Sequence, residues 1–293
     1  MKNAFSAFLL GGLCTVVSCA APEPVEATRV LPGAPEPTPF TRAYSMTEAP
    51  DGIRVYVQEN GDTTEMKLIR PVGNGWSEPE LVVDLPTRRT LTGPHFSRFD
   101  EMFYFSSDAA VPGREGNTDI NIWRAPYLGD GQFGEAEPLA MFGINTGANE
   151  TDTATTKDGT LYFVTNHTHA GGGSYDIMKA REAEDGAWTL EAMPDGVNDM
   201  RTDDHLVVDP EGNWMIFYSH RSPKMGYVDL WISERDASGE WQPAENLGPF
   251  LNTEGIEFGA GLSWDGETLF FSQEGSLYEV PLAAVLTADR AIP

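Results

Sequence analysis

Three acidic residues recur with one spacing and are the first candidates for chemistry. Each lies five residues after an asparagine, which gives the pairs Asn145 and Glu150, Asn198 and Asp203, and Asn252 and Glu257. Carboxylates brought together from three repeats would suit Ca²⁺, a cationic ligand or a polyhydroxylated one. The alternative is structural, because short polar side chains commonly cap turns by bonding local backbone N–H groups. The recurrence itself favours this second interpretation.

Five histidines are present, and two of them lie close to the same repeated positions. We expect His95 and His205 to join Glu150, Asp203 and Glu257 in one ligand-binding group. His167 and His169 form a His-x-His pair in a glycine-rich loop, which is a weak pattern for a metal. We therefore predict no metal site, and no cofactor other than Ca²⁺ at the carboxylate ring.

Nucleophile and cofactor motifs are missing from the sequence. It contains no Gly-x-Ser-x-Gly, no phosphate-binding loop and no His-Glu-x-x-His. Asp119, Asp176 and Asp229 begin equivalent segments, where we expect them to bond the loop before them. The sequence does not decide whether two carboxylates are paired for glycoside hydrolysis, because the distance between them depends on the fold. We thus expect no catalytic residue and a non-enzymatic binding scaffold, the alternative being a channel-centred carbohydrate-active or cation-dependent hydrolase or lyase.

The elements that position these residues are internal repeats. Four short apolar segments align on Phe105, Phe163, Phe217 and Phe271, with spacings of 58, 54 and 54 residues. A weaker fifth copy covers residues 53–58. Turn dipeptides such as Asp-Gly and Glu-Gly precede most copies and supply the positive φ that tight hairpins need. Alternating apolar and polar residues predict short strands, four to a repeat.

Repeats of this size with four antiparallel strands predict the blades of a β-propeller, an all-β fold. The repeats begin near residues 41, 91, 145, 198 and 252, so five blades are expected, with six as the alternative. The last repeat has three clear strands, and we expect the segment from Pro39 to Ala43 to supply its outer strand. The first strand of each blade should line the central channel, where the candidate acids would meet. A short helix is expected only at 282–286.

Two segments carry a resemblance to a known family. Residues 156–163 (TKDGTLYF) and 239–248 (GEWQPAENLG) resemble the WD40-like, TolB-like propeller repeats of exported bacterial proteins. The similarity runs from about residue 44 to residue 282, although proline precedes the turn acid only at Pro50 and Pro210. The resemblance implies a propeller fold. It does not imply one activity, because the family includes interaction platforms as well as enzymes.

The N-terminus is predicted to be a targeting segment. Lys2 is followed by an apolar run over residues 4–17 that is too short to span a bilayer. The run ends in Val16-Val17-Ser18-Cys19, which has the features of a lipobox, and so Cys19 is the expected lipidation site. The only other cysteine, Cys14, lies in the part that would be removed. Disulfides are therefore not expected in the mature protein.

Three regions follow from these features. Residues 1–18 are expected to be a lipoprotein signal peptide, 19–39 a tether rich in Pro, Ala and Glu, and 40–293 the propeller. Ala20 after the cysteine favours the outer membrane, on its periplasmic side. A formal net charge of −26 argues against nucleic-acid binding. We expect a monomer that meets the membrane only through its lipid and binds a cell-envelope protein or polysaccharide.

Overall fold

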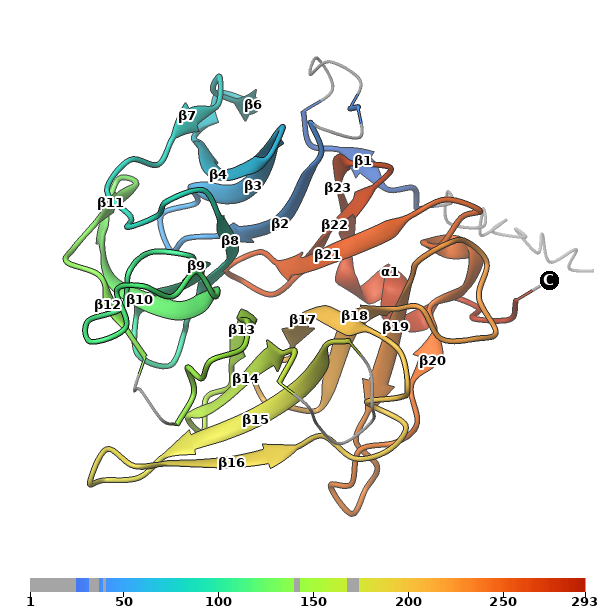
Figure 1. Ribbon diagram of the computed structural model, residues 1–293. Coiled ribbons are helices and arrows are strands. Elements are labelled where there is room, and N and C mark those ends of the chain that lie inside the picture. Colours follow the sequence, from blue (N-terminus) through green and yellow to red (C-terminus); the bar gives the residue numbers. More distant parts are fainter. Residues whose placement is uncertain (1–24, 32–36, 39–40, 140–142, 168–173, 293) are drawn as a thin grey trace, which may run out of the picture.

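Each sequence repeat forms one small antiparallel sheet, and five such sheets surround a central axis (Figure 1). The computed structural model describes residues 25–31, 37–38, 41–139, 143–167 and 174–292. The fold over these residues is a five-bladed β-propeller. The predicted fold class is confirmed, and the six-bladed alternative is wrong.

The innermost strand of each blade is its first strand after the connection from the previous blade. These strands are β2 (Ala43–Glu48), β8 (Leu91–Phe96), β13 (Glu150–Thr155), β17 (Asp203–Val208) and β21 (Glu257–Leu262). Each contacts the innermost strand of the next blade, and β21 contacts β2, so the ring is closed.

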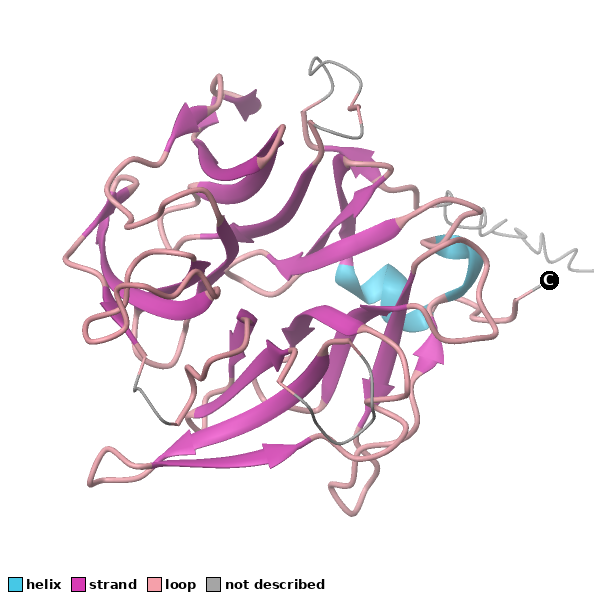
Figure 2. Cartoon of the chain, viewed as in Figure 1, coloured by secondary structure: helices cyan, strands magenta, loops and turns pink. Residues whose placement is uncertain are grey.

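The second strands are the apolar segments that revealed the repeats. They are β3 (Arg54–Asn60), β9 (Met102–Ser107), β14 (Thr160–Thr165), β18 (Trp214–Ser219) and β22 (Thr268–Gln273). The third strands are β4 (Thr63–Ile69), β10 (Asn121–Gly129), β15 (Asp176–Glu182), β19 (Asp229–Glu234) and β23 (Ser276–Pro281). Figure 2 shows how little of the described chain is helical.

The outer strands are short in most blades. Blade 1 ends in β7 (Glu80–Leu81), blade 2 in β11 (Gln132–Phe133) and β12 (Glu137–Pro138), blade 3 in β16 (Trp188–Ala192) and blade 4 in β20 (Glu245–Asn246). A small hairpin of β5 (Pro71–Val72) and β6 (Gly75–Trp76) extends from blade 1. Two helical turns complete the secondary structure, η1 (Gly248–Phe250) and α1 (Leu282–Thr287). The second of these lies where a helix was predicted.

The outer strand of blade 5 comes from the N-terminal part of the chain. β1 (Thr28–Arg29) pairs antiparallel with β23, with Thr28 opposite Glu279. The expectation that an N-terminal segment completes the last blade is correct, but its placement at Pro39–Ala43 is wrong. Ala43 instead begins β2, the innermost strand of blade 1. Two residues of the predicted tether range are thus part of the propeller.

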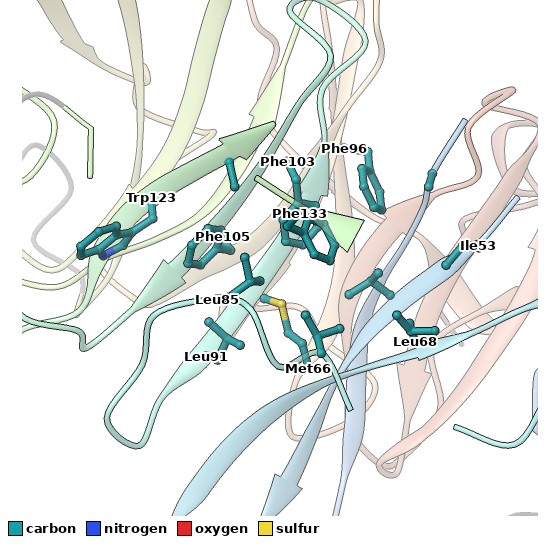
Figure 3. Close-up of a cluster of buried hydrophobic side chains, with 14 of the residues drawn as sticks. Ile53, Met66, Leu68, Leu85, Leu91, Phe96, Phe103, Phe105, Trp123 and Phe133 are labelled. Atoms are coloured by element: carbon teal, nitrogen blue, oxygen red, sulfur yellow. The ribbon is translucent and has the colours of Figure 1, made fainter. Parts of the chain in front are cut away.

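Large apolar side chains fill the space between neighbouring blades. The buried residues form one sizeable cluster at each of the five interfaces, including the interface between blades 5 and 1. Figure 3 shows the cluster between blades 1 and 2, where Phe96, Phe103 and Phe133 meet Met66 and Leu68. Burial of this apolar area is the main favourable term that holds the blades together. In the described part of the chain, no helix is long and apolar enough to cross a membrane.

Candidate functional site

A ring of five equivalent residues surrounds the channel. Each is the third residue of an innermost strand and has a left-handed backbone: Ser45 (φ 48°), Gly93 (φ 58°), Asp152 (φ 39°), His205 (φ 48°) and Gly259 (φ 66°). A β-bulge interrupts the pairing of every innermost strand at this point. Bulges commonly redirect side chains beside functional sites. We call these five residues the channel ring.

Three members of the channel ring, Ser45, Asp152 and His205, lie close together. The Oγ of Ser45 lies 2.9 Å from Nδ1 of His205, and the same nitrogen lies 3.5 Å from Oδ1 of Asp152. Ser45 and His205 belong to blades 1 and 4, so this hydrogen bond passes across blade 5. Gly259 occupies the ring position of blade 5, and because it has no side chain it does not obstruct the hydrogen bond between Ser45 and His205. A Cβ at Gly93 would lie 3.2 Å from Oδ1 of Asp152, so the second glycine keeps that carboxylate clear.

Asp204 adds a second carboxylate beside the ring. Ligand atoms of Asp152, Asp204 and His205 all lie within 4.8 Å of one another. Asp204 accepts hydrogen bonds from the backbone N–H of His205 at 2.7 Å and from the Tyr218 hydroxyl at 3.3 Å. Asp152 makes no hydrogen bond to any described residue through its side chain, although it is only 7% exposed. The two carboxylates therefore differ in how well the protein satisfies them.

Aromatic rings hold the histidine in place. The His205 ring meets Tyr44 and Phe258 edge-on, with centroids 5.5 and 5.7 Å away, and Tyr218 lies 5.3 Å away at a tilt. Such packing restricts the imidazole to one orientation. Tyr44 is 8% exposed, whereas Tyr218 is half-buried.

The local field disfavours negative charge. Burial, together with the charge of Asp152, raises the pKa of Asp204 to about 6. Burial and the nearby Asp204 and Asp152 raise the pKa of Tyr218 far above its ordinary value. Burial also raises the pKa of Tyr44, with smaller contributions from Glu59 and Asp152. In each case burial is the largest cause, and nearby negative charge adds to it.

The three predicted acids do not meet in the channel. Glu150 accepts hydrogen bonds from the backbone N–H of Thr146 (3.0 Å), the Thr146 hydroxyl (2.5 Å) and the Thr165 hydroxyl (3.2 Å). Glu257 repeats this arrangement with Thr253 and Gln273. Both glutamates are fully buried, and burial raises the pKa of each. Their bonding is that of local caps, the structural alternative named above.

Asp203 is a cap with an added ion pair. It accepts the backbone N–H of Asp199 at 2.8 Å and binds the Arg221 guanidinium at 2.5 Å. Arg221 is itself buried, stacks over Phe217 and Trp231, and donates to the Gly196 carbonyl. Burial raises the pKa of Asp203, an effect that Arg221 opposes.

His95 lies away from the channel ring. Its Nε2 accepts the backbone N–H of Thr155 at 3.1 Å and lies 3.0 Å from the Thr155 hydroxyl. It lines a small cavity of about 50 Å³ formed by the second halves of the innermost strands, with Arg98 and Trp264 close by. Burial, reinforced by Arg98, lowers the pKa of His95 to about 4, so the ring is neutral at pH 7.

Of the five predicted ligand-binding residues, the structure therefore places only His205 in the channel ring. Asp152 and Asp204 were visible in the sequence beside the predicted acids, but nothing local indicates the bulge that sets their position. Asp229 accepts backbone N–H groups of Met225 and Gly226 from the loop before it, as expected for this repeated position. Asp119 instead binds Arg114. Cys19 and His169 lie outside the described residues.

Comparisons with known proteins agree on the fold. No protein-family model and no curated protein sequence matches the chain. TolB from Acinetobacter baumannii superposes on 82% of this chain at 14% identity and a TM-score of 0.46, and the chain spans about half (54%) of that protein. A thermostable family-43 glycoside hydrolase matches 83% of this chain and 89% of its own, at 16% identity and a TM-score of 0.52.

A protein from glycoside hydrolase family 130, described as targeting β-1,2 mannosidic linkages in Candida mannan, matches 96% of both chains at 10% identity and a TM-score of 0.52. At such identities the likeness shows the fold alone. The chain is thus a five-bladed β-propeller whose fold is similar to that of glycoside hydrolase propellers, and no family is assigned.

Proposed function

We propose that this protein is a non-enzymatic binding propeller that holds a small polar ligand at Asp152, Asp204 and His205. The asymmetry of the channel ring carries the proposal. The caps at Glu150, Asp203 and Glu257 recur at the same position of three blades, whereas titratable groups occupy the ring in blades 3 and 4 only. A purely structural role would place similar residues at the five ring positions. A binding site needs different residues at them, as is seen here.

The chemistry of the group indicates the kind of ligand. Carboxylates accept hydrogen bonds from hydroxyl groups, and Tyr218 adds an aromatic face and a hydroxyl beside them. Further out, Tyr227 is 65% exposed, and its ring centroid lies 5.2 Å from that of His220. Acids with nearby aromatic rings suit a polyhydroxylated ligand such as a cell-envelope polysaccharide fragment, and the charge of −26 disfavours an anionic one.

Titration calorimetry of the purified protein with neutral sugars and cell-wall fragments tests this. Binding should be lost in Asp152→Asn and Asp204→Asn, because each change removes a charged acceptor and keeps the side-chain volume. Glu257→Gln is the matched control, as it alters a buried carboxylate that caps a turn. Binding that survives both aspartate changes, or that is lost only with Glu257→Gln, would contradict the proposed site.

Glycoside hydrolysis is the second candidate, and one observation favours it. Asp204 has a pKa raised to about 6 and accepts two hydrogen bonds. The neighbouring Asp152 accepts none from a described residue. A pair of neighbouring carboxylates, one of them with a raised pKa, is the arrangement that glycoside hydrolysis uses. Release of a chromophore from aryl glycosides by the wild-type protein, abolished in Asp204→Asn, would favour this candidate over simple binding.

The predicted lipid anchor belongs to the same proposal. A propeller tethered through Cys19 would present its channel ligand site at the periplasmic face of the outer membrane and could share it with an envelope protein or polysaccharide. Metabolic labelling with a radioactive fatty acid should mark the wild-type protein and not Cys19→Ser. Equal labelling of both would reject the anchor and leave the ligand proposal intact.

A further inference from the structure

We infer that Asp152, Asp204 and His205 form a binding site for one divalent metal cation. The inference rests on the proposed function, since it names what occupies the same channel site. Metal–ligand bonds of about 2.0–2.6 Å allow two ligands on opposite sides of an ion to lie about 4–5 Å apart. The donor atoms of the three residues lie within 4.8 Å of one another, so a single ion reaches all of them.

Asp152 supplies the independent observation that points to a ligand. Its side chain is more than nine-tenths buried, yet it forms no hydrogen bond to a described residue. Its nearest charged partner is Nδ1 of His205, at 3.5 Å. Solvent still reaches part of this carboxylate, since 9% of the side chain is exposed. Burying a carboxylate to this extent with only a histidine beside it costs free energy, and such groups are normally paired or bound to metal. Bonding to a cation would remove that cost.

The charge balance points the same way. Among the described residues, neither Asp152 nor Asp204 forms an ion pair with a lysine or an arginine. Arg42, which stacks over Phe258, is already paired with Glu59. A dication would balance both carboxylates where water screens them poorly.

Two glycines of the channel ring lie close to the three residues or to their partner Ser45. Gly93 and Gly259 occupy two ring positions without side chains. A Cβ at Gly93 would press on Asp152, and one at Gly259 would come within 3.3 Å of Ser45 Oγ. Ser45 Oγ lies 2.9 Å from Nδ1 of His205, the nitrogen that also faces Asp152, so an ion bound through Nδ1 would take the place of this hydrogen bond.

The donor set indicates which cation is preferred. Two carboxylates and an imidazole nitrogen suit Mn²⁺ or Zn²⁺ better than Ca²⁺ or Mg²⁺, which favour oxygen ligands alone. Three protein ligands leave coordination positions open for water or for the hydroxyls of a sugar. The cation would then connect the protein to a polyhydroxylated ligand.

The test measures metal binding directly. Protein stripped with EDTA and dialysed would be titrated with MnCl₂ and followed by electron paramagnetic resonance of free Mn²⁺, then with ZnCl₂ and CaCl₂ by calorimetry. We expect one tight site per chain, weakened about tenfold or more in Asp152→Asn and in His205→Gln. Because the surface is acidic, a variant with Glu182→Gln, Glu184→Gln and Asp185→Asn serves as the matched control, and its tight site should remain.

A structural readout covers the case in which a variant fails to fold. In the wild-type protein, Mn²⁺ should broaden the NMR signals of the His205 ring before those of His95 or His220. Broadening spread evenly over the acidic surface, or binding unchanged in Asp152→Asn, would overturn the inference. Sugar binding that is equal with and without EDTA would overturn it while leaving the proposed function standing. A single Mn²⁺ site in a protein that binds no sugar would support the metal site and contradict the proposed function.

Discussion

Asn198 holds both backbone polar groups of Ile177 with its side-chain amide. Its Oδ1 accepts the Ile177 N–H at 2.9 Å, and its Nδ2 donates to the Ile177 carbonyl at 2.9 Å. Asn145 and Asn252 form the same pair of bonds in the neighbouring blades, to Ile122 and Leu230. Each asparagine thus fastens the start of one blade to the third strand of the blade before it.

Asn198→Ala should lower the free energy of unfolding by about 2–4 kcal/mol, because two buried hydrogen bonds are lost and the Ile177 N–H is left without a partner, while the Ile177 carbonyl keeps the Met193 N–H at 3.3 Å. Chemical denaturation followed by tryptophan fluorescence measures the change. Asn117→Ala is the control, since Asn117 is exposed and its side chain makes no recorded hydrogen bond. Equal stability of the two variants would show that the amide contributes little.

Asp203→Asn should destabilise the fold by about 3–5 kcal/mol and leave ligand and metal binding intact in the folded fraction. The substitution leaves the buried Arg221 guanidinium with only the more distant carboxylate of Asp199, at 3.9 Å, as its counter-charge. Glu211→Gln, which removes one partner of an exposed pair with Lys157, should cost less than about 1 kcal/mol. A binding defect larger than the loss of folded protein would return Asp203 to the list of site residues.

The sequence predicted the strands better than it predicted the site. The four second strands that contain Phe105, Phe163, Phe217 and Phe271 were predicted from the sequence, because an apolar run after a tight turn is a local feature. The position of the site is not local. Whether Asp203 or Asp204 reaches the channel depends on strand register, and an added residue at a bulge changes that register by one. The caps were predicted as an alternative for the same local reason, since Glu150 and Thr146 are four residues apart.

Gly259→Ala should destabilise the propeller by about 2–4 kcal/mol and abolish ligand binding. The new Cβ would sit in a left-handed backbone, 2.7 Å from the Ser45 nitrogen and 3.1 Å from the Tyr44 Cβ. Gly239→Ala has a similar φ but open space around its Cβ, so it should cost only about 1 kcal/mol. Thermal unfolding compares the two, and similar melting temperatures would argue against close contact in the ring.

His95 should make the fold less stable in mild acid. Its pKa is about 4 in the folded protein and about 6.5 when unfolded, so the unfolded state binds more protons between these values. Its contribution to stability is complete above pH 6.5 and falls as the pH drops toward 4, by at most about 1.4 kcal/mol per pH unit. His95→Gln should lack this component, and the difference between the two proteins, measured by denaturation from pH 8 to 4, isolates it. Parallel curves would contradict a neutral His95.

Removal of residues 1–31 should lower the melting temperature more than removal of residues 1–24. The longer deletion takes away β1, and with it Val30, which is 3% exposed and packs between blades 5 and 1. The backbone N–H of Val30 also donates to the Leu277 carbonyl at 2.9 Å. Differential scanning calorimetry compares the two deletions, and equal melting temperatures would show that blade 5 is stable without its outer strand.

The pairing of β1 with β23 closes the propeller ring between the two ends of the chain, and this affects how the protein folds during synthesis. Each of the first four blades forms its sheet from consecutive residues, whereas Arg29 meets Ser276 across 247 positions of sequence. A nascent chain leaves the ribosome with its first segment unpaired until nearly all the rest has been made. Contacts between such distant residues form slowly. Ring closure is therefore the final event of folding, and chains terminated early would expose an open edge to proteases and to one another.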